Sequence, residues 1–445
     1  MRKIIVATTG LMLVGALSAG VVSTASAATI NFSGDARARF YYQDNYGSPL
    51  TLGANGVNRP DTSQTFWQSR VRLVFKIETK GGAYAVGRFR LLDSYPKGWD
   101  NGAGGAAGWS ANGATANDST SPSTASIRAD IGYVGLPLGP VTIEAGTGVN
   151  TMDEFFRADN FYNFIRGKYT GGNTTVQLFM EKFSEYQQTG TVTSIDAKTG
   201  LAVSKTIIDD NYTSDDDVNH YGLRLIQKFN NSWQLDTTLF VLDNQQNNDG
   251  NTGFGWTGVV TGKINDVSVI VGGAYKSSDY MKYEGSLDDN GYGIYAGVNV
   301  PIGIASVSAV VGGTFNGYLA SGDFGGDGQE PYVPFIMLSN ASSTEVIGML
   351  NTGIRLGSAT GDAWFVNVAP SVKISDKLTL TGECTYAQVD VNMKNKSNLS
   401  LWEVGGIASY AVTDGAKISA LLGYLNIEDS DNQPLGFGLA LDLAF

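Results

Sequence analysis

The chain has 445 residues but only one cysteine and one histidine. The single Cys384 excludes a disulfide scaffold, a cysteine-rich zinc site and a c-type haem, which needs a C-x-x-C-H stretch. The single His220 excludes a histidine cluster and the HExxH motif. We therefore expect no metal and no cofactor. In phase with Leu378 and Leu380, Cys384 itself is expected to be a small lipid-facing side chain.

Long apolar runs are also missing. Beyond the first two dozen residues, no run of about 20 apolar residues is present, which excludes a bundle of membrane helices. The N-terminus begins with the positive Met1-Arg2-Lys3, continues with an apolar stretch and reaches a small-residue cleavage box at 25–27. This pattern predicts a signal peptide over 1–27, with an anchoring helix as the alternative, and a single domain over 28–445.

Charge is scarce and predominantly negative. Charged residues make up 16% of the sequence, against about 25% in an ordinary soluble protein. The net charge is −12, and removal of Arg2 and Lys3 with the signal peptide makes it −14. Such a balance argues against nucleic acid as a partner. The acidity lies after residue 170, because residues 28–170 hold 14 basic and 12 acidic side chains.

The sequence is rich in glycine and aromatic residues, and from Thr29 onwards apolar residues recur with a period of two. This period is typical of a strand with two different faces. About 18 such segments follow, of roughly 9 to 15 residues, and a transmembrane strand needs about 9 to 11. The expected strands are 29–42, 65–79, 82–92, 126–136, 140–148, 161–170, 174–183, 217–229, 232–243, 254–264, 267–276, 290–300, 304–316, 362–374, 377–389, 398–412, 416–426 and 435–445.

Eight short turns and nine long polar links alternate between these strands, as in an up-and-down barrel with both termini on one side. The sequence thus predicts an all-β, antiparallel transmembrane barrel of about 18 strands. Apolar residues in 332–356 leave open an extra hairpin, which would make 20 strands, or a plug; merging weak segments would make 16. Closure requires the last strand to pair with the first. The alternating end of the chain, with Leu441, Leu443 and Phe445 on one face, is expected to serve membrane assembly.

The chain resembles the general diffusion porins of Gram-negative outer membranes. The signal peptide, the terminal strand ending in Phe445 and the stretch IGYVGLPLGPVTIEAG at 131–146 carry the resemblance. That stretch is similar to the hairpin that precedes the inward-folded third loop of porins, although Glu144 and Gly146 stand where porins commonly carry an arginine. The resemblance implies an outer-membrane location, a water-filled channel and a homotrimer, with lipid and small hydrophilic solutes and ions as its partners.

Paired arginines on the non-lipid face of the first strands are the sharpest local signal. If the second hairpin turns about Lys80, Arg72 lies opposite Arg88 and Arg70 opposite Arg90. Like charges across a ladder are tolerable only where water, counter-ions or facing acids screen them. The expected basic wall of the pore comprises Arg37, Arg39, Arg70, Arg72, Arg88, Arg90, Arg128, Arg166 and Lys168.

The third loop, roughly 150–160, carries acids that could face this wall. Asp153, Glu154 and Asp159 are the expected constriction acids, and together with the arginines they would create a transverse field. The alternative is that the arginines solvate the inner wall away from the narrowest point. A run of aspartates within 209–217 allows a calcium site, but a solvated loop is the favoured interpretation, and His220 is expected to be a wall residue.

The leading functional hypothesis is passive diffusion of small hydrophilic solutes and ions, with size exclusion and an electrostatic filter. A channel selective for anions such as carboxylates is the first alternative. A structural barrel around exported partners such as cytochromes is the second. An enzyme is not expected, because one histidine allows only a single histidine-dependent site.

Overall fold

The computed structural model describes most of the chain after residue 27. The described residues are 28–44, 63–94, 128–150, 152, 161–184, 189–195, 202–208, 218–230, 232–244, 251–283, 289–318, 339–340, 355–356, 362–389, 399–428 and 433–445. Several predictions fall outside these ranges: the signal peptide 1–27, the constriction acids Asp153, Glu154 and Asp159, the aspartate run within 209–217, and most of 332–356.

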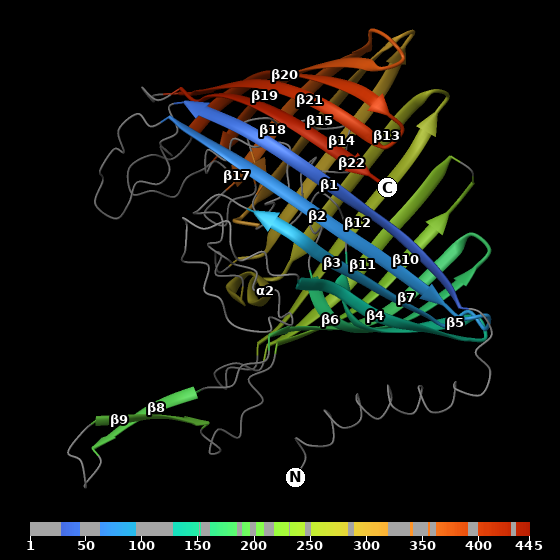
Figure 1. The fold of residues 1–445 in the computed structure, drawn as a ribbon, viewed down its shortest axis with the longest axis vertical. Helices are drawn as coiled ribbons and strands as arrows, with labels where there is room; N and C mark the ends of the chain where they lie inside the picture. Colours follow the sequence, from blue (N-terminus) through green and yellow to red (C-terminus); the bar gives the residue numbers. More distant parts are fainter. Residues whose placement is uncertain are drawn as a thin grey trace.

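Eighteen antiparallel strands form one closed sheet (Figure 1), which confirms the predicted barrel and its strand number. Each strand pairs with the next along the chain, and β22 pairs back onto β1 to close the ring. Gly34 and Phe445 exchange backbone hydrogen bonds at this seam. In order around the ring the strands are β1 (Thr29–Asp44), β2 (Gln64–Glu78), β3 (Tyr84–Ser94), β4 (Arg128–Leu138), β5 (Val141–Val149), β6 (Phe161–Gly171), β7 (Thr174–Ser184), β10 (Val218–Lys228), β11 (Trp233–Asn244), β12 (Asn251–Ile264), β13 (Val267–Lys276), β14 (Gly291–Ile302), β15 (Ala305–Phe315), β18 (Ala363–Lys373), β19 (Leu378–Val389), β20 (Leu399–Thr413), β21 (Ala416–Ile427) and β22 (Leu435–Ala444).

The period-two pattern divides the side chains into an exterior and an interior face. On β22 the exterior residues Leu441, Leu443 and Phe445 are 54%, 45% and 60% exposed, whereas the interior Ala440 is buried. Cys384 is likewise exposed on the exterior. Large apolar side chains stay exposed on nearly every strand, which is the exterior of a barrel solvated by lipid.

In the described part of the chain, five further elements lie outside the 18-stranded sheet, within links predicted to be loops. The hairpin of β8 (Thr189–Ile195) and β9 (Ala202–Ile208) extends away from the barrel (Figure 1). The two-residue strands β16 (Ser339–Asn340) and β17 (Arg355–Leu356) pair in parallel with each other, so this bridge adds no strand to the barrel. Helix α2 (Ser278–Tyr283) follows β13. Within the described part of the chain, no helix has the length and apolar character to cross a membrane.

The predicted register of the second hairpin is wrong by two residues. The turn spans Thr79 to Ala83 instead of closing at Lys80, as the hydrogen bond from the Thr79 N–H to the Ala83 carbonyl shows. Arg72 therefore lies opposite Arg90, not opposite Arg88. A bulge at Leu91 of β3, opposite the step from Val71 to Arg72, shifts the ladder again and places Arg70 opposite Asp93, not Arg90. The shifts leave all four arginines on the interior face.

A charge placed on the exterior face should unfold the barrel more easily than the same charge inside. We expect Leu439→Arg, near the middle of β22, to lower the free energy of unfolding by about 2 to 4 kcal/mol, because the guanidinium would enter lipid. Ser409→Arg on the interior face of β20 is the control and should cost much less. Denaturant titration in lipid vesicles measures both, and equal losses would contradict a lipid-facing exterior.

Candidate functional site

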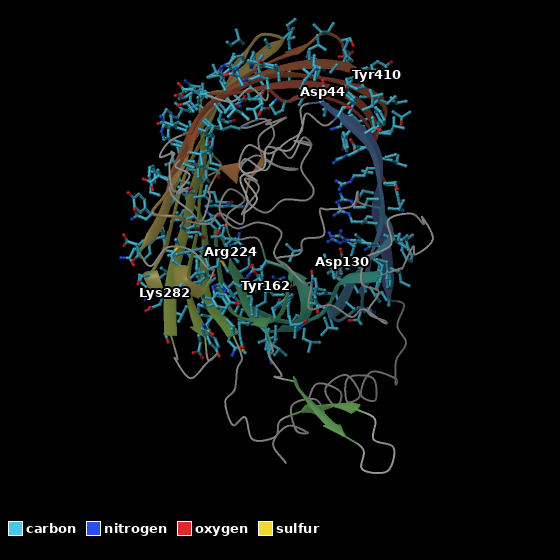
Figure 2. All side chains as sticks on the ribbon, turned by 90° about the vertical axis from the view of Figure 1, so that its left-hand side faces the viewer. Asp44, Asp130, Tyr162, Arg224, Lys282 and Tyr410 are labelled. Carbon is cyan, nitrogen blue, oxygen red and sulfur yellow. The ribbon has the colours of Figure 1, made fainter. Side chains whose placement is uncertain are left out.

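Six arginines cluster on the interior face of β1, β2 and β3, as their strand phase predicts. Figure 2 shows nitrogen-bearing side chains projecting inward from the blue strand at one side of the barrel. Arg37, Arg39, Arg70 and Arg90 are almost fully buried, whereas Arg72 and Arg88 are partly exposed. Arg37 lies directly opposite Arg70 across the β1–β2 ladder. The folding of three successive strands thus concentrates guanidinium groups on one sector of the wall.

Carboxylates on neighbouring strands offset this concentration. Asp35 of β1 accepts a hydrogen bond from Arg72 Nε at 2.7 Å, and its other carboxylate oxygen lies 3.4 Å from Arg70 Nη2. Asp442 of β22 lies 3.4 Å from Arg39 Nη2 and occupies the register position opposite Arg37. Close pairing of this kind lowers the repulsion between like charges on adjacent strands. Some of the acids that pair with these arginines therefore lie on the barrel strands and not in the third loop.

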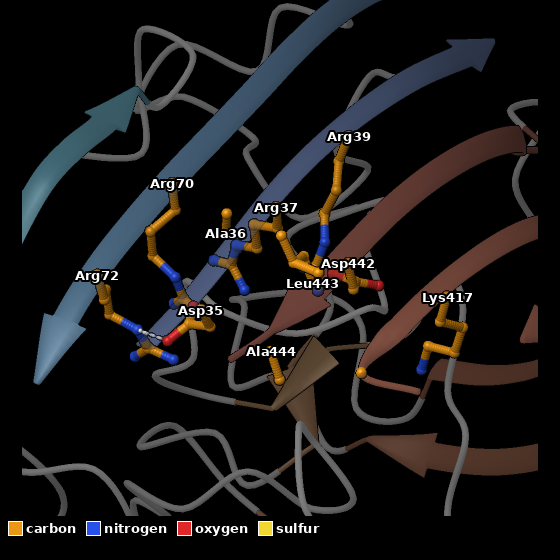
Figure 3. Close-up of a pocket in the computed structure, with 11 residues that line it drawn as sticks. Asp35, Ala36, Arg37, Arg39, Arg70, Arg72, Lys417, Asp442, Leu443 and Ala444 are labelled. Carbon is orange, nitrogen blue, oxygen red and sulfur yellow. Dashed lines mark hydrogen bonds and ion pairs between the residues drawn. The ribbon is translucent and has the colours of Figure 1, made fainter. Parts of the chain in front are cut away.

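A cavity of about 350 Å³ lies against this cluster (Figure 3). Figure 3 shows Arg70 and Arg72 on one strand, and Arg37, Arg39 and Asp35 on the next, with side chains converging on the same space. Lys417 of β21 completes the basic lining from the far side of Asp442. The volume is within the range of small-ligand pockets, which is about 300 to 1,000 Å³.

Asp130 of β4 pairs with the remaining two arginines. Arg88 donates to both of its oxygens, from Nε at 2.8 Å and from Nη2 at 2.9 Å, and Arg90 also donates to it. Bidentate pairing fixes the plane of a guanidinium group as well as its position. The backbone of Arg128 lies opposite Arg90 in the β3–β4 ladder.

A second group of polar side chains crosses β3 to β6 in one row. The Tyr84 hydroxyl and the Arg166 guanidinium both donate to Glu144. Tyr84 reaches Glu144 across Gly135, where a Cβ would overlap the tyrosine ring, so glycine makes room for the ring at this position. Lys168, two residues after Arg166, is exposed near the end of β6. Arg166 and Lys168 thus lie inside the barrel but apart from the six-arginine cluster.

The opposite sector of the wall carries a packed apolar cluster. β10, β11 and β12 are the eighth to tenth strands of the ring, half-way round from β1. There Phe240 and Leu242 of β11, with Phe179 of β7, the strand adjacent to β10, bury Tyr280 of α2 and Met152. Tyr280 packs so closely on Gly253 of β12 that a Cβ there would lie 2.6 Å from the tyrosine nitrogen. Helix α2 is therefore seated inside the barrel.

His220 is fully buried in this apolar cluster, as a wall residue. Its Nδ1 lies 3.0 Å from Glu181, which also accepts a hydrogen bond from Asn150. The imidazole contacts the ring of Phe240 at a centroid distance of 4.8 Å. Asn150 and Met152 come directly after β5, so the third loop starts inside the barrel, against the wall that faces the arginines.

Sequence reasoning missed the acids of the wall, although their signal was present. The strand phase places Asp35 on the interior face with Arg37 and Arg39, but it does not by itself identify Asp35 as a partner of the arginines. Asp130 and Asp442 needed the pairing of whole strands, since each lies on a strand different from its arginine. Helix α2 gave no usable signal, because six residues are too few for a helical period to show.

No family model matches the sequence, and no curated protein matches it. Solved structures match almost the whole chain. OpdQ of Pseudomonas aeruginosa superposes with a TM-score of 0.53 at 11% identity, covering 94% of this chain and 98% of its own. A BenF-like porin from Pseudomonas fluorescens gives 0.53 at 12% identity, with 94% and 99% coverage, and OccAB2 of Acinetobacter baumannii gives 0.52 at 13%, with 93% and 98%. At these identities the fold is what is shared, and the expected porin architecture is confirmed.

Substitution of Gly135 tests the Tyr84–Glu144–Arg166 row. We expect Gly135→Val to lower the free energy of unfolding by about 1 to 3 kcal/mol, because its side chain would displace the Tyr84 ring. Gly132→Val on the same strand is the matched control, since nothing lies within 4 Å of a Cβ there. Denaturant titration compares the two, and an equally small loss in both would show that Tyr84 does not lie across Gly135.

Proposed function

We propose that the protein is an outer-membrane channel of a Gram-negative bacterium, through which small hydrophilic solutes and ions diffuse passively. The observation that carries this proposal is the cluster of six arginines on the interior of a closed porin barrel, with a cavity of about 350 Å³ beside it. The chemistry of the cluster is recognition and not bond-breaking, because guanidinium groups bind carboxylates and phosphates without giving up a proton.

The six arginines on β1, β2 and β3, called the arginine wall from here on, would act as an electrostatic filter. Its carboxylates hold the guanidinium groups in place, and the positive potential that remains attracts anions into the lumen. A solute crossing the barrel at this level passes between the arginines and the cluster that contains α2 and Met152. We propose that Asp153, Glu154 and Asp159 of the third loop supply the negative side of the field.

A channel selective for small carboxylates is the second candidate. The cavity favours it, because Arg70 and Arg72 on one strand and Arg37 on the next converge on a volume suited to one small anion. Saturable block of the conductance by a carboxylate solute would distinguish this selective channel from a general pore.

Neutralising one buried arginine should weaken the preference for anions. We expect Arg70→Gln to lower the anion-over-cation permeability ratio by about twofold at 0.1 M salt, and Arg37→Gln/Arg70→Gln to lower it further, because the positive potential falls. Reversal potentials in planar bilayers under a KCl gradient measure the ratio.

The control is Lys282→Gln on α2, which removes the same charge from the opposite side of the barrel. Heat-modifiable electrophoretic mobility verifies that each variant is folded. Unchanged selectivity in the folded double variant would contradict the arginine filter.

A homotrimer is the assembly that the porin resemblance implies, and we retain it as a prediction. Three equal conductance steps per insertion event, together with a trimeric cross-linked band, are the expected result. Single steps and a monomeric band would contradict it while leaving the channel function standing.

A further inference from the structure

A lysine followed by an apolar residue recurs at the turn-side ends of the strands. Each pair lies within three residues of a strand end, on β2, β6, β10, β12, β18 and β21. The pairs are Lys76-Ile77, Lys168-Tyr169, Lys228-Phe229, Lys263-Ile264, Lys373-Ile374 and Lys417-Ile418.

Strand alternation turns the two members of each pair to opposite faces. The apolar members stay on the exterior, where Phe229, Ile264 and Ile374 are 61%, 56% and 54% exposed. The lysines consequently point to the interior of the barrel. Lys168 lies on the same face of β6 as Arg166, and Lys417 lies on the same face of β21 as the buried Ser419. Together they form the turn-side lysine ring, defined as Lys76, Lys168, Lys228, Lys263, Lys373 and Lys417.

These lysines are spread around the whole mouth. Successive members are two to four strands apart in the ring, which is about 10 to 20 Å at about 4.8 Å between neighbouring strands. Lys168, Lys228, Lys263 and Lys373 are exposed, and Lys76 and Lys417 are partly exposed. The arginine wall occupies one sector, whereas this ring encircles one opening.

Only part of the ring's charge is neutralised by nearby acids. Lys76 pairs with Glu78 at 2.7 Å and Lys373 with Asp376 at 3.2 Å. Among the described residues, no carboxylate lies within 4.0 Å of the ammonium groups of Lys168, Lys228, Lys263 or Lys417. Other acids toward this end, among the described residues, are Asp266 and Asp414 in turns, and Asp35, Glu144, Asp236 and Asp442, which pair with Arg72, Arg166, Arg224 and Arg39.

We propose that the turn-side lysine ring is a second anion-binding station, which concentrates anions such as carboxylates and phosphates at the turn-side mouth and passes them to and from the arginine wall. Lys417 belongs to the ring and also lines the cavity at the arginines, so the two stations are contiguous. The inference rests on the proposed channel function and adds the path by which anions reach its filter.

Salt provides the signature of such a ring. Exposed charges act over about 10 Å at 0.1 M salt, so the fields of neighbouring lysines overlap across the mouth. At 1 M salt the range is about 3 Å, and the lysines act singly. The effect of the ring must therefore fade at high salt, whereas a change in pore width would persist.

The test compares two variants that lose the same charge. Lys228→Gln/Lys263→Gln removes two ring lysines that have no carboxylate within 4.0 Å among the described residues, and Lys80→Gln/Lys377→Gln removes two lysines that lie in turns instead of on an interior face. We expect the ring variant alone to lower the anion-over-cation permeability ratio by about twofold at 0.1 M KCl and to match wild type at 1 M. Tripolyphosphate, added from each side, should block wild type at lower concentration from the turn side and lose this preference in the ring variant.

Equal effects of the two variants, or an effect that persists at 1 M, would overturn the ring. If Arg70→Gln shifts the selectivity and the ring variant does not, the ring is wrong and the proposed function stands. A silent wild-type channel would contradict the proposed function instead. Calorimetric titration of tripolyphosphate into the solubilised proteins then decides the ring, and equal binding by wild type and ring variant would overturn it.

Discussion

Closure of the sheet is the constraint on which the rest of the structure depends. No strand edge can remain unpaired in lipid, so β22 must return to β1 and all 18 strands must keep compatible registers. Closure also explains the alternating pattern, because one face of every strand then lines a single enclosed interior and the other face is exterior. The period of two thereby assigns Leu441 to lipid and Asp442 to the lumen, although the two residues are neighbours in the chain.

On the described strands β1 to β4 and β22, arginines and aspartates lie close together on the interior face, where the opposite charges offset the repulsion between the like ones. Arg37 faces Arg70 and Arg72 faces Arg90 directly across ladders, which would be unfavourable in isolation. Asp35, Asp130 and Asp442 offset this cost from within the same wall. A chain with net charge −12 thus retains a basic sector inside, held by acids that also fix the guanidinium groups in place.

The barrel could be predicted from sequence because it depends on a local signal repeated 18 times. The interior position of the arginines followed from the same signal, as did the exterior position of Cys384. The register of the second hairpin could not be predicted, because a longer turn and a bulge at Leu91 each shift it without changing the alternation of apolar and polar residues. The position of α2 inside the barrel could not be predicted either, because it depends on the contact between Gly253 and Tyr280, which are far apart in the sequence. The lysine–apolar pairs are visible in the sequence, but only the observed strand ends show that these lysines surround the same opening of the barrel.

The measurement that tests the account most directly is the reversal potential of the refolded wild-type protein in a planar bilayer under a salt gradient. If the basic wall controls permeation, the sign of the potential will show a preference for anions, and the preference will grow as salt is lowered. A preference for cations would mean that the overall negative charge controls the pore, and would contradict an arginine filter.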